Sequence, residues 1–204
     1  HYMIALVRTA PPSEDRHAGM SQMIIDLKAP GVTIRPIRNL AGDSHFNEEV
    51  FTDYFVPDER LVGEVGDGWN QVVSELGYER SGPERFLSTF RVFVELVRAV
   101  GPDPSPRAVE ALGRLAVHVM TLRSMSLSVA GMLQRGLMPN VEAAVVKDMG
   151  TNFAKALPEV ARILVQAEPD ANVGPAFEEA FSEGLLYAPI FTIQGGTREI
   201  LRGI

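Results

Sequence analysis

Cysteine is absent from the 204 residues of this chain, and several kinds of chemistry are excluded with it. Without a thiol the chain forms no disulfide, no thiolate metal site and no cysteine nucleophile, a composition compatible with a reducing cytoplasm. Basic residues are also few, because 19 lysines and arginines face 26 acidic residues and leave a net charge of −7. That charge works against binding to nucleic acid or to an anionic membrane. We therefore expect neither partner, and a cytoplasmic location.

The sequence also lacks the patterns of metal, hydrolase and membrane proteins. Its four histidines, His1, His17, His45 and His118, are scattered, and no pair has metal-ligand spacing. No nucleophile elbow surrounds a serine, and no apolar run approaches the roughly 18 residues that a membrane helix needs. The first residues, HYMIALVRT, include no initiator methionine at their start and run directly into an expected strand. We expect no metal site and no membrane span, and a piece of a longer chain.

The apolar pattern changes near residue 66 and divides the chain into two expected domains. Before it, runs at 2–9, 19–27, 31–38 and 48–57 are rich in β-branched and aromatic residues, with Pro, Gly and Asp between them. We expect residues 1–65 to form a small antiparallel β domain. From 66 to 204 apolar residues recur at helical spacing, so the predicted fold class is α+β.

Breaks at 101–106 (GPDPSP) and 136–140 (GLMPN) divide the second part into three long helices and a shorter fourth. Four such helices pack most economically as an antiparallel four-helix bundle. Each long helix is expected to bury one apolar stripe. The stripes are Phe86, Phe90, Phe93, Val97 and Val100 on the first helix, Leu112, Leu115, Val119 and Leu122 on the second, and Val145, Met149, Phe153, Leu157 and Val160 on the third.

Two short stretches contain residues suited to a binding site. In IQGGTREI, Gly195 and Gly196 leave the backbone bare, and Thr197 is placed to cap a following helix. Free amides at a helix start suit an anionic cofactor group, although ordinary loop-to-helix junctions have the same pattern. In SELGYER, Glu79 directly precedes Arg80. Such a pair is usually part of a solvated helix face, so neither stretch alone identifies a site.

Five segments together resemble the acyl-CoA dehydrogenase family in order and approximate spacing. They are HYMIALVRT, SQMIIDLKAPGV, NEEVFTDYFVPDERLVGEVGDGW, ELGYER and FTIQGGTREILR. The resemblance runs from the middle β domain through the C-terminal helical domain and covers nearly the whole chain, although 101–185 match only as a helical pattern. It implies a flavoprotein that binds FAD and forms an α,β double bond in an acyl-CoA thioester.

The resemblance also implies roles for individual residues. Gly196, Thr197 and Glu199 match positions that lie near FAD in the family. The family's usual catalytic glutamate is replaced by Gly195, whose backbone N–H is expected to bind the thioester carbonyl. Glu79, before Arg80, matches the base of a subgroup similar to isovaleryl-CoA and long-chain acyl-CoA dehydrogenases. Glu79 is therefore the expected base, and Arg80 is expected to fix the charge arrangement around it.

Other positions depart from the family pattern. The family's Arg-x-x-Phe-Gly segment has no clear counterpart in RVFVELVRAVGPDPSP, and only Gln166, in VQAEPD, matches the Gln-x-x-Gly-Gly motif that contacts FAD. Gly77 stands where an aspartate often precedes the base. Two functions follow. One is a dehydrogenase that passes electrons to an electron-transfer flavoprotein; the other is a non-catalytic subunit that completes an FAD site. Either homo-oligomers or hetero-oligomers with a paralogous subunit are compatible with this pattern.

Overall fold

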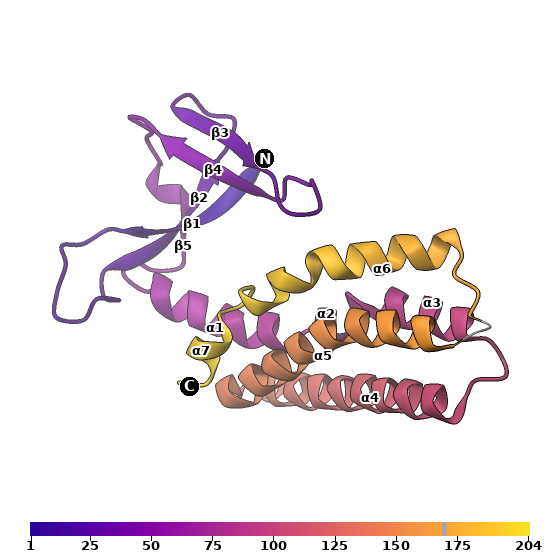
Figure 1. Ribbon diagram of the computed structural model, residues 1–204. Coiled ribbons are helices and arrows are strands. Elements are labelled where there is room, and N and C mark those ends of the chain that lie inside the picture. Colours follow the sequence, from indigo (N-terminus) through magenta and orange to yellow (C-terminus); the bar gives the residue numbers. More distant parts are fainter. Residues whose placement is uncertain (169–170) are drawn as a thin grey trace. The chain divides into compact units, whose positions relative to one another are not determined.

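The computed structural model describes residues 1–168 and 171–204 (Figure 1). Two compact units make up the chain, one from His1 to Glu75 and one from Leu76 to Ile204. The division falls inside helix α1 (Gly68–Ser81), and the domain boundary expected between residues 65 and 66 stays a prediction. The last two residues of VQAEPD, 169 and 170, lie outside the described part.

The first unit contains two small antiparallel sheets, as expected for a β domain. The strand runs predicted from the sequence are confirmed, except that the fourth strand starts and ends earlier than expected. Asp53, whose φ of 47° is positive, stops the extended backbone soon after that strand. The sheets are β1 (Tyr2–Arg8), β2 (Met20–Asp26) and β5 (Leu61–Val62) in the order β1-β2-β5, and β3 (Val32–Ile37) with β4 (Phe46–Phe51); the 3-10 helix η1 (Asp58–Arg60) precedes β5.

The GDGW segment at the start of α1 packs directly on β2. The Gly66 N–H donates to Ser21 Oγ at 2.9 Å, and a Cβ at Gly68 would lie 2.7 Å from the Ser21 Cα. No real side chain tolerates that distance, so glycine is required at position 68. Trp69 stacks on His17 with ring centroids 3.9 Å apart. The helix start is therefore fixed on the sheet by close backbone packing.

The second unit is the expected bundle of four main helices. Helix α5 lies at its centre and contacts α3, α4 and α6 (Figure 1). Ser105 caps α4 by accepting from the Ala108 N–H, and Pro106 follows at the first helical position. The helices are α2 (Glu84–Leu87), α3 (Phe90–Val100), α4 (Pro106–Gln134), α5 (Asn140–Ala167), α6 (Pro175–Tyr187) and α7 (Arg198–Leu201), with the 3-10 helix η2 (Ala188–Thr192) after α6.

The first long helix predicted from the sequence is wrong as a single element. It consists of α1, α2 and α3, because Gly82 and Pro83 separate α1 from α2, and Pro83 has no N–H to continue a helix. Each restart changes the phase of the apolar stripe. On α3 the buried residues include Val92 and Leu96, whereas the predicted Val97 is 43% exposed.

The stripes predicted for the second and third long helices are confirmed in most positions. Leu115 and Leu122 of α4 and Phe153 and Leu157 of α5 are buried in one apolar cluster. Val145 is the exception, because its side chain is 44% exposed. The neighbouring buried positions on α5 are instead taken by Val146 and Lys147. A buried lysine needs polar partners, so polar groups are expected against that end of the helix.

Helix α4 differs from the expectation that no apolar run is long enough for a membrane helix. By length and composition it meets that criterion, with a mean hydropathy of 1.2 over its most apolar window, 22% of which is buried. Core helices of soluble bundles meet the same criterion. Leu115, Leu122 and Val129 of α4 are buried, so part of its apolar surface serves the bundle.

Candidate active site

The segment from Phe191 to Thr197 begins with the last two residues of η2, leads into α7 and contains the glycine pair; we call it the glycine loop. Gly195 has φ of 71° and Gly196 has φ of 106°, both in the region that L side chains rarely adopt. Thr197 caps α7, as predicted, because its hydroxyl accepts from the Ile200 N–H at 3.4 Å. Among the described residues, no hydrogen bond is recorded for the Gly195 N–H as donor. This amide is therefore available to a ligand.

Glu79 and Arg80 lie in the last turn of α1. Arg80 Nε donates to the Gly195 carbonyl oxygen at 2.9 Å. A Cβ built at Gly195 would lie 3.2 Å from Glu79 Oε1. The Glu79 carboxylate therefore approaches the space that a side chain at position 195 would enter. The structure brings together residues that are 115 positions apart in the sequence.

Arg85, on α2, is a member of this cluster that the sequence did not indicate. Its Nη2 donates to the Glu79 carbonyl oxygen at 2.9 Å and lies 3.9 Å from Glu79 Oε1. The side chain is 2% exposed, and its Nε has no hydrogen-bond partner among the described residues. Helix α2 also sits close to α5, since a Cβ at Gly150 would lie 2.8 Å from Arg85 O. This contact places Arg85 beside Gly150 along the axis of α5.

Two side chains of α5 donate hydrogen bonds to backbone oxygens of the loop. Lys147 Nζ donates to Gly196 O at 2.7 Å and approaches Thr192 O at 3.5 Å. Thr151 Oγ1 donates to Phe191 O at 2.8 Å. Together with Arg80, these two side chains bind four carbonyl oxygens of one loop; we call Arg80, Lys147 and Thr151 the loop clamp.

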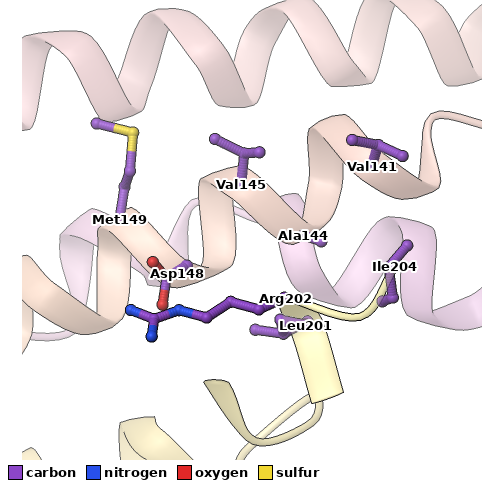
Figure 2. Close-up of a pocket in the computed structure, with 8 residues that line it drawn as sticks. All are labelled: Val141, Ala144, Val145, Asp148, Met149, Leu201, Arg202 and Ile204. Carbon is purple, nitrogen blue, oxygen red and sulfur yellow. The ribbon is translucent and has the colours of Figure 1, made fainter. Parts of the chain in front are cut away.

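A second contact of α5 reaches the helix beyond the loop. Arg198 Nε donates to Asp148 Oδ1 at 2.6 Å, next to Lys147 in sequence. Asp148 also lines a pocket of about 190 Å³ between α5 and the end of the chain (Figure 2). Apolar side chains make most of the remaining wall, among them Val141, Val145 and Leu201. The pocket and the loop clamp thus share one stretch of α5.

Positive charge dominates the site. Burial lowers the pKa of Lys147, and the nearby Arg85, Arg80 and Arg198 lower it further, while Asp148 raises it. Burial likewise lowers the pKa of Arg80, which Glu79 opposes. The side chain of Glu79 is 44% exposed within this chain, so its carboxylate is reachable.

The remaining predicted residues lie at two different places. Glu199 is in the first turn of α7, where hydrogen bonds from its own backbone N–H and from Thr197 lower the pKa of its carboxyl. Gln166 is near the other end of α5, 19 residues after Lys147, which corresponds to about 28 Å along the helix. Gln166 therefore does not join the glycine loop. No cluster of three metal-ligating side chains occurs among residues 1–168 and 171–204.

The fold is that of acyl-CoA dehydrogenases. The structure of "Tcur3481-Tcur3483 steroid ACAD G363A variant" superposes with a TM-score of 0.85 at 20% identity, covering 99% of this chain and 55% of its own. Butyryl-CoA dehydrogenase from Megasphaera elsdenii superposes with a TM-score of 0.83 at 19% identity, covering 100% of this chain and 54% of its own.

The sequence is similar to curated proteins of the same kind. It is 31% identical over 208 residues to acyl-CoA dehydrogenase IpdE1 of Mycolicibacterium smegmatis, covering 100% of this chain and 51% of that protein. It is 30% identical over 199 residues to acyl-CoA dehydrogenase FadE34 of Mycobacterium tuberculosis, covering 97% of this chain and 27% of that protein. No family model matches the chain. The chain is a relative of the acyl-CoA dehydrogenases that spans about half the length of such relatives or less.

Proposed function

We propose that this chain is part of an FAD-dependent acyl-CoA dehydrogenase in which Glu79 removes the α proton of the substrate. The observation that carries the proposal is the approach of Glu79 Oε1 to the position of a Cβ at Gly195. In the family that the sequence resembles, a glutamate at the position of Gly195 is the usual base. A carboxylate reaching the same space from α1 supplies the same chemical group from a different part of the backbone.

In the proposed reaction, different residues of this chain accept the proton and stabilise the developing charge. The Glu79 carboxylate accepts the α proton, and the guanidinium groups of Arg80 and Arg85 lie in the same cluster. As the proton leaves, negative charge moves onto the thioester carbonyl oxygen. The Gly195 N–H, which is free to donate, stabilises that charge. Desolvation of the partly exposed Glu79 would be completed when substrate and cofactor cover it.

The residues of the loop are compatible with FAD beside Glu79. Gly196 presents a backbone without a side chain, and a Cβ there would lie 3.4 Å from Arg80 Nη2. We propose that Gly196, Thr197 and Glu199 contact the cofactor, which when bound accepts the β hydride of the substrate. Gln166, at the far end of α5, is proposed to contact FAD of a neighbouring subunit, because it lies too far away to reach the same group as Gly196.

The test of this function is Glu79→Gln in the full-length protein that contains this chain, loaded with FAD. Acyl-CoA thioesters with straight, branched and steroid-derived acyl groups are added without oxygen, and flavin absorbance is followed. The wild type should bleach with at least one thioester. The variant should bleach about 10³-fold more slowly, because a positioned base contributes roughly 10²–10⁴ in rate. Equal rates in both proteins would contradict the role of Glu79.

A second function is favoured by the separation of Gln166 from the glycine loop and by one similar structure whose name joins two proteins. In it the protein is a non-catalytic subunit that completes the FAD site of a paralogue. A purified wild type that retains no FAD alone, and gains it on mixing with a paralogous subunit, would support this alternative. Bleaching by the protein alone would exclude it.

The remaining partners follow from the same proposal. We propose that acyl-CoA is the substrate and that electrons pass on to an electron-transfer flavoprotein. The assembly is either a homo-oligomer or a hetero-oligomer with a paralogous subunit, located in the cytoplasm. Sedimentation of the purified full-length protein, alone and with its paralogue, distinguishes the two assemblies.

A further inference from the structure

Lys147 is the most unusual buried side chain of the second unit. It is 0% exposed, and lysine is almost never fully buried unless its charge is paired. Among the described residues, no carboxylate oxygen lies within the 4.0 Å of an ion pair with its Nζ. Its two recorded hydrogen bonds go to backbone oxygens of the glycine loop, Thr192 O and Gly196 O. An aliphatic side chain would fill this place at lower cost in desolvation, so the ammonium serves the loop.

The loop requires such an anchor because of its two glycines. Adjacent glycines have more backbone freedom than any other pair of residues, and both are held at positive φ. Lys147 binds the carbonyl of Thr192 before the Gly195 N–H and the carbonyl of Gly196 after it. Arg80 binds Gly195 O between them. These hydrogen bonds therefore hold the backbone on both sides of the Gly195 N–H, the amide that is expected to act on a substrate.

We propose that Lys147 is a positioning residue that holds the Gly195 N–H in the direction needed to bind the thioester carbonyl of acyl-CoA. The inference rests on the proposed function, since it assigns a cause to the placement of that amide. Lys147 touches neither substrate nor cofactor and acts through the loop. Burial and the neighbouring arginines lower the pKa of Lys147, and Asp148 opposes them.

The experiment compares two CoA ligands that differ only in the carbonyl oxygen. An acyl-CoA thioester and the matching alkyl-CoA thioether are titrated into the FAD-loaded full-length protein, in a Glu79→Gln background so that the thioester is not consumed. The ratio of their dissociation constants reports the contribution of the carbonyl contact. Lys147→Met removes the ammonium at similar length. Lys155→Met, at an exposed position of α5, is the matched control.

Lys147→Met should reduce the preference for the thioester about tenfold, the size expected for the loss of one well-oriented hydrogen bond, and Lys155→Met should leave it unchanged. A lysine with only a structural role would weaken both ligands alike and leave the ratio constant, which would overturn the inference while the proposed function stands. A protein that retains FAD but binds neither ligand before Lys147 is changed would overturn both.

Folding of the variant is checked by circular dichroism before the titration. Should Lys147→Met fail to fold, Lys147→Gln takes its place, because its amide keeps a donor but is one bond too short to reach Gly196 O. The same loss of thioester preference is expected from it. An unchanged ratio in Lys147→Gln would overturn the inference.

Discussion

The two halves of α5 differ in the contacts that their buried side chains make. In the first half, Lys147 and Thr151 are buried polar residues whose side chains bind carbonyl oxygens of the glycine loop. In the second half, Leu157, Ala161 and Leu164 are buried in the apolar cluster of the bundle. The first half adds directional hydrogen bonds to its apolar packing, in which Val146 clusters with Val129, whereas these residues of the second half contribute packing alone. One helix thus couples the candidate site to the core, and each half should respond differently to mutation.

The largest change in stability is expected in the apolar half. Leu157→Ala should lower the free energy of unfolding by about 2–5 kcal/mol, because Leu157 is 0% exposed and its truncation leaves a cavity. Urea unfolding of the purified protein measures the effect. Ile163→Ala, on the same helix but 44% exposed, is the control and should change stability by about 0.5 kcal/mol or less. Equal losses would mean that the apolar half is not the core of the unit.

A smaller loss of stability, accompanied by an effect on the loop, is expected in the polar half. Thr151→Val should cost about 1–3 kcal/mol, because the carbonyl of Phe191 loses its donor while the side-chain volume is kept. The same urea unfolding measures it. Proteolysis of the native protein should also become faster at the loop from Phe191 to Thr197.

Thr89→Val is the matched control for Thr151→Val. Thr89 is 2% exposed, like Thr151 at 1%, but its hydroxyl has no hydrogen-bond partner within the part of the chain that the structure describes. Its replacement should be neutral or stabilising. If both variants lose stability to the same extent, the hydrogen bond to Phe191 O contributes nothing specific.

The smallest effect concerns pH at the junction of the two halves. His118 of α4 packs edge-on against Phe153, with ring centroids 5.2 Å apart, and burial lowers its pKa below the ordinary 6.5, opposed by a hydrogen bond with the Met149 backbone. The unfolded chain then binds the proton more readily than the folded one. Stability is therefore complete above pH 6.5 and falls as pH decreases through that value.

This pH dependence is measured as the difference in urea unfolding between the wild type and His118→Gln at several pH values. The wild type should lose stability relative to the variant as pH falls from 7.5 to 5.5. A constant difference across this range would show that His118 has the same pKa in both states.

The sequence predicted elements better than it predicted burial within them. The strands at 2–8, 20–26 and 32–37 were found because alternation and turn residues are local signals. The stripe predicted on the first long helix is confirmed at Phe86 and Val100, which are buried, but not at Val97, which is exposed. Val92 and Leu96, which the predicted stripe did not include, are buried on α3.

The candidate site was predicted only where a motif marked it. Glu79, Arg80 and Gly195 were found through family motifs and lie together. Lys147 was missed because a lysine in an amphipathic helix usually faces water, and its burial depends on a loop about 45 residues later. A lysine four residues before a threonine on an otherwise apolar face was the available signal. Arg85 was missed because its partners depend on the break between α1 and α2.

The close approach of α2 to Gly150 has a mechanical consequence. Arg85, which donates to the Glu79 backbone, packs on α5 at that glycine. The loop with Gly195 is hydrogen-bonded to α5 at Lys147, three residues before Gly150, and at Thr151, one residue after it. The proposed base, Glu79, and the proposed amide, that of Gly195, are therefore both held in place by contacts with α5. A displacement of α5 is therefore expected to move both groups together and to preserve the spacing between the Glu79 carboxylate and the Gly195 N–H donor.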